Sequence, residues 1–371
     1  MEGTKPRTAS SIGMFDMLKG AGMLTIVFAH TAELYPMQAV SGLSLTAFFP
    51  FIYREALMAA FFIASGYGFR KRSIHKCIHQ QLKSLLKPYA YTALFTCVLH
   101  FIIHYKTFQY LPGTIGESIK VTGGFLLGLP HTAEYFGQEF FSCGPMWYLL
   151  ALMVGWVLLD VILNIFPERY VPWAVAGCVL LGWGASLVWE LPFCLIQGAV
   201  VVPYLYIGFL AKKKHLLDEP LPPKDFAGLL AATALIAVGA LATRTTDCIS
   251  LAEWSLGPLS IFLDGAAGLL FIRLFMRLSH GHGPIVHFLE AVGRRSLNIF
   301  CVHTVEIIAI PWYLMVAKFS AQPVLGMWLQ YAIALGSIWL VCELLRVRRA
   351  LIIRFFPAQR RTPAVHYTSR H

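Results

Sequence analysis

The stretch from Phe15 to Glu33 reads FDMLKGAGMLTIVFAHTAE, and it decides the class of fold. It has nearly the length and apolar character of a helix that crosses a bilayer, which needs about 20 mostly apolar residues. It also carries Asp16, Lys19 and His30. An ionisable side chain at membrane depth costs at least about 2.5–3.5 kcal/mol on insertion scales, so such groups are rarely idle. The stretch therefore predicts a membrane-spanning helix that contributes to a functional site.

The composition of the whole chain also indicates a membrane protein. Of its 371 residues, 57% are hydrophobic and 13% are charged, whereas a soluble domain has about 25% charged residues. So little charge cannot cover a globular surface, which excludes a soluble enzyme, a disordered chain and a secreted disulfide scaffold. The predicted fold class is all-α, a polytopic integral membrane protein. The polar first residues show no cleavable signal, so the first apolar stretch is expected to stay in the protein.

Ten stretches have the length and hydropathy of spanning helices, four of them with internal ionisable groups. Residues 122–129 are interpreted as a possible re-entrant or interfacial piece. The ten predicted spans are residues 11–32, 46–69, 88–105, 140–159, 170–189, 191–211, 226–243, 256–273, 296–316 and 319–342.

The lysines and arginines predict the orientation, because cytoplasmic loops carry an excess of both. With the amino terminus inside, only five of the 30 lie on the outer side, and the even number of spans brings the carboxyl terminus inside as well. Residues 1–345 form the predicted transmembrane domain and residues 346–371 a basic cytoplasmic tail. The net charge of +11 is assigned to this bias and not to nucleic-acid binding. The five outer cations are Arg54, Lys106, Lys120, Arg244 and Lys318.

Two His–Glu pairs have the same spacing. His30 and Glu33 are three residues apart, as are His303 and Glu306 in SLNIFCVHTVEII. Each carboxylate therefore shares a helix face with its imidazole and can orient it. At 1.5 Å per residue, His30 lies roughly 16 Å from Lys19, which places a cation near the cytoplasmic face and an imidazole past the bilayer centre. The pairs indicate acid–base chemistry at similar depths, but the spacing leaves open whether their helices touch.

Several other polar groups have a structural and a functional interpretation. Asp264 interrupts an apolar run near mid-membrane, while Asp160 is expected to be solvated at an inner helix end. The eight cysteines form no CxxC pair, so no metal site is predicted. Cys143 and Cys248 fall in predicted outer loops, where free thiols are favoured over a disulfide. The Arg54–Glu55 pair is as readily structural as functional, and the His100–His104 pair is interpreted mainly as a polar stripe near the outer surface.

Five ordered motifs resemble the type-3 family of integral-membrane acyltransferases. Lys19 and His30 match its pattern of a basic residue, ten residues and a histidine in the first span. The segment KSLLKPY is most similar to the branch that acetylates fucose and related sugars or exopolysaccharide. Ser84 and Phe300 depart from the family pattern, which often has Arg and Tyr there. The other four segments are FFIASGYGFRKR (61–72), KSLLKPY (83–89), GPMWYLLAL (144–152) and GRRSLNIFCVH (293–303).

The resemblance implies transfer of an acyl group, usually acetyl, from cytoplasmic acyl-CoA to a hydroxyl of an extracytoplasmic or lipid-linked glycan. The expected partners are acyl-CoA, that acceptor and membrane lipids, with no nucleic acid and no metal. The expected location is a bacterial inner or plasma membrane. A proton-coupled transporter or flippase, and a sensor or scaffold, are the alternatives, because embedded charges suit them too. A membrane-bound O-acyltransferase of the other major class fits less well, as its histidine lies in a later helix.

The resemblance and the embedded charges together give the candidate site. His30 is the expected general base, or with less support a covalent acyl carrier, and Glu33 holds its tautomer. His303 with Glu306 is expected to bind the acceptor or stabilise an oxyanion. The Arg70–Arg72 cluster has a solvated-loop alternative and Gly66 a helix-packing alternative. The expected donor-binding residues are Asp16, Lys19, Ser65, Gly66, Arg70, Lys83 and Lys87, and the expected acceptor-binding residues are Trp147, Asp264, Ser296 and Asn298.

Overall fold

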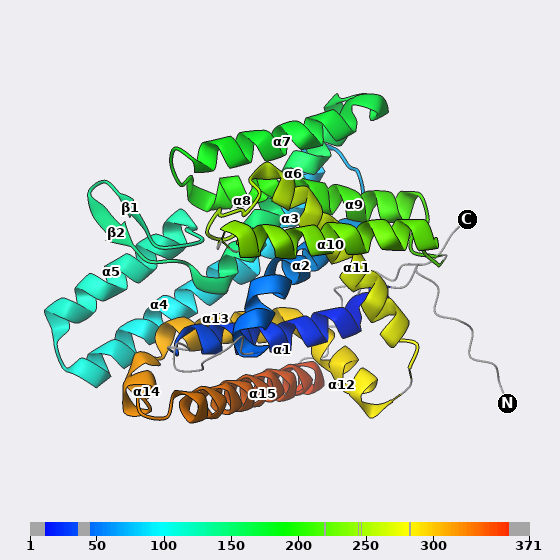
Figure 1. The fold of residues 1–371 in the computed structure, drawn as a ribbon. Coiled ribbons are helices and arrows are strands. Elements are labelled where there is room, and N and C mark those ends of the chain that lie inside the picture. Colours follow the sequence, from blue (N-terminus) through cyan, green and yellow to red (C-terminus); the bar gives the residue numbers. More distant parts are fainter. Residues whose placement is uncertain are drawn as a thin grey trace.

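The structure, a computed structural model, describes residues 12–35, 45–218, 220–243, 245, 247–281 and 283–355. Most of these residues are helical, and the strands of the described part form one short antiparallel hairpin, β1–β2 (Figure 1). The elements are η1 (Ile12–Phe15), α1 (Asp16–Glu33), α2 (Leu45–Tyr67), α3 (Ile74–Gln81), η3 (Leu82–Leu86), α4 (Lys87–Phe108), α5 (Leu111–Leu127), β1 (Ala133–Tyr135), β2 (Gln138–Phe140), η4 (Gly144–Met146), α6 (Trp147–Ile165), η5 (Glu168–Tyr170), α7 (Val171–Ser186), η6 (Pro192–Cys194), α8 (Leu195–Val200), α9 (Val202–Lys213), α10 (Pro223–Thr243), α11 (Pro258–Leu278), α12 (Pro284–Gly293), α13 (Ser296–Ala309), α14 (Tyr313–Lys318) and α15 (Pro323–Phe355).

The structure confirms the all-α, polytopic membrane class. Among the described residues, five helices are long and apolar enough to cross a membrane, and the bent pair α8–α9 would make a sixth. The count of ten spans and the cytoplasmic termini stay predictions, although every predicted span overlaps a helix. Helix α15 continues through the proposed domain boundary at residue 345 to Phe355, and the rest of the basic tail lies outside the described residues.

Prolines explain where several helices begin or break. The predicted span at residues 140–159 becomes helix α6 only at Trp147, after η4 with its proline in the first turn. The span at residues 191–211 divides into α8 and α9, which meet at 50°, and Pro203 lies in the first turn of α9. A proline lacks the amide hydrogen and fits the first helical turn, where that hydrogen has no partner anyway.

Helix α5 lies between two predicted spans, and the sequence analysis does not predict it as a separate helix. It packs against α4, and the two lie side by side at one edge of the bundle (Figure 1). Its final turns include most of residues 122–129, which the sequence pattern indicates as a re-entrant or interfacial piece. Helix α5 therefore adds a second wall beside α4, and both helices later contribute to a cavity.

Helix α1 lies inside the bundle, in contact with α2, α11, α12, α13 and α15. Its approach to α12 depends on two glycines. A Cβ added at Gly20 would lie 1.9 Å from the Leu289 carbonyl oxygen, and one at Gly293 would lie 1.8 Å from that of Asp16. Both obstacles are backbone atoms, so neither can swing away. The two glycines therefore fix the depth of α1, and with it the position of Lys19 one residue before Gly20.

Gly20→Ala is expected to destabilise the fold, because the added methyl group must push α1 away from α12. Overpacking of this kind costs about 1–3 kcal/mol in the free energy of unfolding. Thermal unfolding of the detergent-purified protein measures the effect. Gly177→Ala in α7 is the matched control, since nothing lies within 4 Å of its added Cβ. A Gly20→Ala protein as stable as the Gly177→Ala protein would contradict the close approach.

The cysteines are all free thiols, and Cys143 and Cys248 are both buried. The two thiols are therefore free, as the sequence favours, and no disulfide joins Cys143 to Cys248. Within the described ranges, no three His, Cys, Asp or Glu side chains group closely enough to hold a metal ion.

Candidate active site

Two cavities meet inside the helix bundle. The first, about 630 Å³, is lined by Lys19, Arg70 and Lys212 together with many apolar side chains, and we call it the basic cavity. The second, about 1570 Å³, is lined by residues that include His30 and Glu33, and we call it the histidine cavity. The three cations of the basic cavity are residues that the charge distribution assigns to the cytoplasmic side. Helix α1 therefore presents a cation to one cavity and an imidazole to the other.

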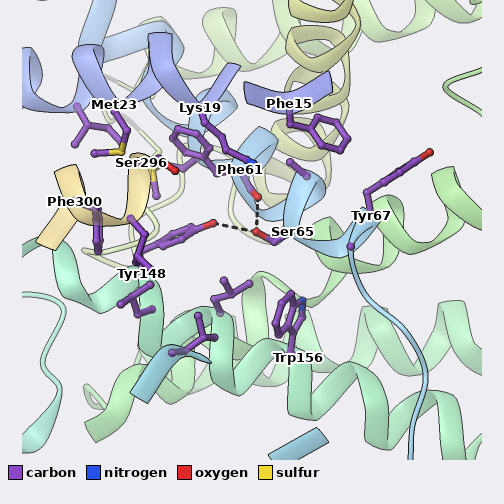
Figure 2. A pocket seen from close by; sticks show the side chains of 18 of the residues that line it. Phe15, Lys19, Met23, Phe61, Ser65, Tyr67, Tyr148, Trp156, Ser296 and Phe300 are labelled. Atoms are coloured by element: carbon purple, nitrogen blue, oxygen red, sulfur yellow. Dashed lines mark hydrogen bonds between the residues drawn. The ribbon is translucent and has the colours of Figure 1, made fainter. Parts of the chain in front are cut away.

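The basic cavity combines charged, hydroxyl and apolar groups in its lining. Lys19 forms an ion pair with Asp16, with 3.4 Å between Nζ and Oδ1, and its side chain is 28% exposed. Ser65 and Ser296 contribute hydroxyl groups. In Figure 2, Lys19 and Ser65 both face the pocket, with Phe61 beside them. The lining suits a ligand that has both anionic and apolar groups.

A buried carboxylate holds the loop that follows Arg70. The Arg72 amide donates a hydrogen bond to Asp160 Oδ1 at 3.0 Å, and Asn164 Nδ2 donates to the Arg72 carbonyl at 2.8 Å. Asp160 is fully buried, so the expectation of a solvated helix end is wrong. A buried carboxylate needs hydrogen bonds to offset its desolvation, and the Arg72 amide supplies one. Asp160 and Asn164 thus fix the loop next to Arg70.

The structure separates Lys83 and Lys87 from the basic cavity. Lys83 lines a different cavity, of about 610 Å³, with His75, Lys76 and His79 around α3. The ammonium of Lys87 lies over the Tyr91 ring, 5.8 Å from its centroid. The structure supplies Lys212 to the basic cavity instead. The sequence signal for Lys212 is the run of three lysines at the end of α9. Charge counting assigns this run to the inner side but does not predict that one of its lysines lines a cavity.

The two His–Glu pairs come together in space. The ring centroids of His30 and His303 are 5.6 Å apart, so helices α1 and α13 bring the repeated pairs side by side. His30 Nδ1 lies 3.4 Å from Glu33 Oε2, and His303 Nδ1 lies 2.9 Å from Glu306 Oε2. A carboxylate at Nδ1 favours the tautomer whose Nε2 is free of hydrogen and can accept a proton.

The two pairs differ in their access to the cavities. The His30 side chain is 27% exposed and lines the histidine cavity. His303 is 1% exposed and lines neither cavity. Its partner Glu306 is also buried, and the Glu306 backbone carbonyl accepts a hydrogen bond from Trp312 Nε1 at 3.3 Å. In this structure His30 borders a cavity, whereas His303 is buried with its ring beside that of His30.

The histidine cavity has a polar wall and an aromatic wall. Helices α4 and α5 supply His100, His104 and Glu117 to the polar wall. The His100 and His104 rings are 5.6 Å apart, and His104 Nδ1 lies 2.9 Å from Thr114 Oγ1. His100 and His104, interpreted from the sequence mainly as a polar stripe near the outer surface, therefore face a cavity. The aromatic wall consists of Phe28, Trp328 and Tyr331, whose ring centroids are 5.3, 5.4 and 6.0 Å apart.

The candidate residues divide into three groups by position: those that line the basic cavity, those that line the histidine cavity and those that line neither. Gly66 packs on α9, where an added Cβ would lie 2.2 Å from the Leu205 carbonyl oxygen, as helix packing requires. Asp264 is buried in α11 and lines neither cavity. Lining the basic cavity are Lys19, Ser65, Arg70 and Ser296, and lining the histidine cavity are His30, Glu33 and Trp147; Asp16, Gly66, Lys83, Lys87, Asp264, Asn298, His303 and Glu306 line neither.

Sequence reasoning missed several lining residues. Tyr148 stands inside the segment GPMWYLLAL, yet only its neighbour Trp147 was singled out. Glu117 and His131 line the histidine cavity although they come from outside the predicted spans. Their signal was the presence of ionisable residues near an apolar segment, which does not by itself predict a cavity. His131 is held by the Ser250 carbonyl oxygen, 2.9 Å from its Nδ1.

These features define a polytopic membrane protein in which a cation-lined cavity and an imidazole-bearing cavity meet between the helices. The sequence model of a family described as an acyltransferase domain matches residues 12–347. The chain belongs to this acyltransferase family, since the match covers nearly its whole length. It matches no curated protein and no solved structure.

Proposed function

We propose that this membrane acyltransferase moves an acyl group, most simply acetyl, from acyl-CoA in the basic cavity to a hydroxyl in the histidine cavity. The acceptor is an extracytoplasmic or lipid-linked glycan. One observation carries the proposal: the two cavities share four lining residues, Ile26, Met58, Tyr148 and Phe300. A donor and an acceptor that enter from different sides can therefore meet within the protein, close to His30.

The basic cavity supports a donor that carries phosphate groups. Lys19, Arg70 and Lys212 supply cations, and an arginine guanidinium matches phosphate with two parallel hydrogen bonds. The rest of the lining is mainly apolar, with Phe61, Leu149 and Trp156 among its residues. Cations and apolar surface in one cavity would fit the phosphates and the pantetheine arm of an acyl-CoA.

The chemistry assigned to His30 follows from its exposure and its partner. With Glu33 at Nδ1, Nε2 accepts the proton of the attacking hydroxyl. A new C–O bond forms at the thioester carbonyl, the C–S bond breaks, and the CoA thiolate leaves. The proton held by His30 then passes to the thiolate or to solvent. In this scheme His303 and Glu306 stabilise the orientation of the His30 ring, because His303 has no access to either cavity.

The walls of the histidine cavity support a polar acceptor with ring faces. Aromatic side chains provide flat apolar surfaces, and His100, His104 and Glu117 supply hydrogen-bonding groups. A sugar has both kinds of surface, apolar ring faces and hydroxyl edges. Trp147 lines the same cavity and adds a further aromatic face.

The decisive experiment incubates the detergent-purified protein with radiolabelled acetyl-CoA and a panel of fucose and hexose glycosides. An acyltransferase labels a glycoside and releases one CoA thiol for each label. A proton-coupled transporter or flippase would consume no donor, and would instead accumulate a glycoside in proteoliposomes in response to a proton gradient. Absence of labelled product with every glycoside, together with gradient-driven uptake, would overturn the proposal.

Glu117→Gln is expected to raise the KM for the glycoside acceptor about tenfold or more, because a hydrogen bond to a charged group contributes about 1.5–3 kcal/mol. The KM for acetyl-CoA should stay unchanged, since Glu117 lines only the histidine cavity. Glu139→Gln is the matched control: both carboxylates contact Lys120, at 3.4 and 3.7 Å, but Glu139 lies on β2 away from the cavity lining. Equal effects of the two variants would exclude a contact between Glu117 and the acceptor.

A further inference from the structure

Four side chains lie between the basic cavity and the histidine cavity, and each lines both. They come from four different helices, Ile26 from α1, Met58 from α2, Tyr148 from α6 and Phe300 from α13. We call this set the partition. His30 lines only the histidine cavity, and Lys19 lines only the basic cavity. The partition therefore stands between the donor and the base.

Tyr148 is the fixed part of the partition. Ser65 Oγ donates to the Phe61 carbonyl at 2.9 Å, so its single hydrogen is used and the Tyr148 hydroxyl donates to Ser65 at 3.3 Å. The Tyr148 ring packs 4.6 Å from the Phe62 centroid and 6.0 Å from that of Phe300. Figure 2 shows Tyr148 reaching from beside Phe300 towards Ser65. Aromatic packing at one end and a hydrogen bond at the other hold this side chain in place.

Met58 is the adaptable part of the partition. A methionine is unbranched and has three rotatable side-chain bonds, whereas the β-branched Ile26 has a restricted first torsion. Met58 therefore yields more readily than the other three when a group crosses from one cavity to the other. The space that it can release limits the size of that group.

From this arrangement we infer that the partition selects the acyl group by size, with Met58 as the residue that sets the limit. The inference rests on the proposed function, in which the donor lies in the basic cavity. An acetyl group requires little displacement of the partition, and each further methylene requires more. One methylene in an apolar pocket changes specificity by roughly 10–200-fold, so a few methylenes suffice for strong selection.

The test compares hexanoyl-CoA with acetyl-CoA as donors for Met58→Ala. The ratio of their kcat/KM values, measured by thiol release that depends on a glycoside acceptor, is expected to rise at least tenfold over the parent. Met23→Ala is the matched control, because Met23 has the same side chain and lines only the basic cavity. Its ratio should stay within about twofold of the parent. A control ratio that rises as much as that of Met58→Ala would overturn the inference, since extra room anywhere in the basic cavity would then suffice.

A second variant covers the case in which Met58→Ala does not fold. Ile26→Val removes one methylene from the same partition, and its ratio should rise in the same direction by a smaller factor. If the parent transfers acetyl but neither partition variant raises the ratio above that of Met23→Ala, the size-selection inference is wrong and the proposed function stands. If the parent transfers no acyl group to any glycoside, the proposed function itself fails.

Discussion

His30→Gln is expected to lower kcat for acyl transfer by about 10²–10⁴-fold, the range that general acid–base catalysis supplies. Glutamine keeps much of the side-chain size but accepts no proton near neutral pH. Because His30 lines only the histidine cavity, binding of acyl-CoA should remain within about twofold of the parent. Acceptor-dependent thiol release measures the rate, and equilibrium binding of labelled acetyl-CoA measures the affinity.

The matched control for His30 is His104→Gln, which removes another imidazole from the same cavity. Its effect should appear mainly in the KM for the acceptor. A His30→Gln enzyme that acylates at the parent rate, with equal protein in the membrane, would rule out the catalytic role. The covalent alternative is decided by incubating the parent with labelled acetyl-CoA and no acceptor: retained label that the His30 variant lacks would replace general-base catalysis with an acyl-histidine route.

Lys19→Met is expected to weaken acyl-CoA binding by about tenfold or more. The substitution removes one cation from the basic cavity while it keeps an unbranched side chain, and a charge-assisted hydrogen bond to phosphate contributes about 1.5–3 kcal/mol. The kcat at saturating donor should change little, because Lys19 does not line the cavity that holds His30. Equilibrium binding of labelled acetyl-CoA at two salt concentrations measures the effect, which should be smaller at high salt.

Lys83→Met is the matched control, because the sequence and the structure assign Lys83 to different sites. The sequence places Lys19 and Lys83 in the same donor-binding group, but Lys83 lines the cavity around α3 and not the basic cavity. Its substitution should leave acetyl-CoA affinity unchanged. A loss of affinity in Lys83→Met equal to that in Lys19→Met would contradict the assignment of the donor to the basic cavity.

The proposed roles of the two histidines depend on burial. The spacing of residues is the same in both pairs, and both carboxylates face Nδ1. The neighbours differ: His303 and Glu306 are buried within the bundle, whereas His30 and Glu33 reach a cavity. The expectation was that His303 binds the acceptor or stabilises an oxyanion, and we propose instead that it positions His30.

The sequence alone determined the class of fold and the helices that carry the candidate residues. Hydropathy sets which segments enter the membrane, and a helix fixes which residues three or four positions apart share a face. These local rules were enough to predict spans that all overlap helices and to single out Lys19, His30 and Glu33, while the family resemblance added Ser65. They also gave the repeated His–Glu spacing.

Only the tertiary structure decided which of these helices touch and where the cavities lie. The approach of α1 to α13 places His30 beside His303, and the packing of α4 and α5 turns His100, His104 and Glu117 towards a cavity. Lys83 carries the same charge as Lys19 in the same family pattern, yet it faces elsewhere. The physical reason is that side chains far apart in the chain meet through helix packing, which depends on the shape of both partners and leaves no fixed spacing in the sequence.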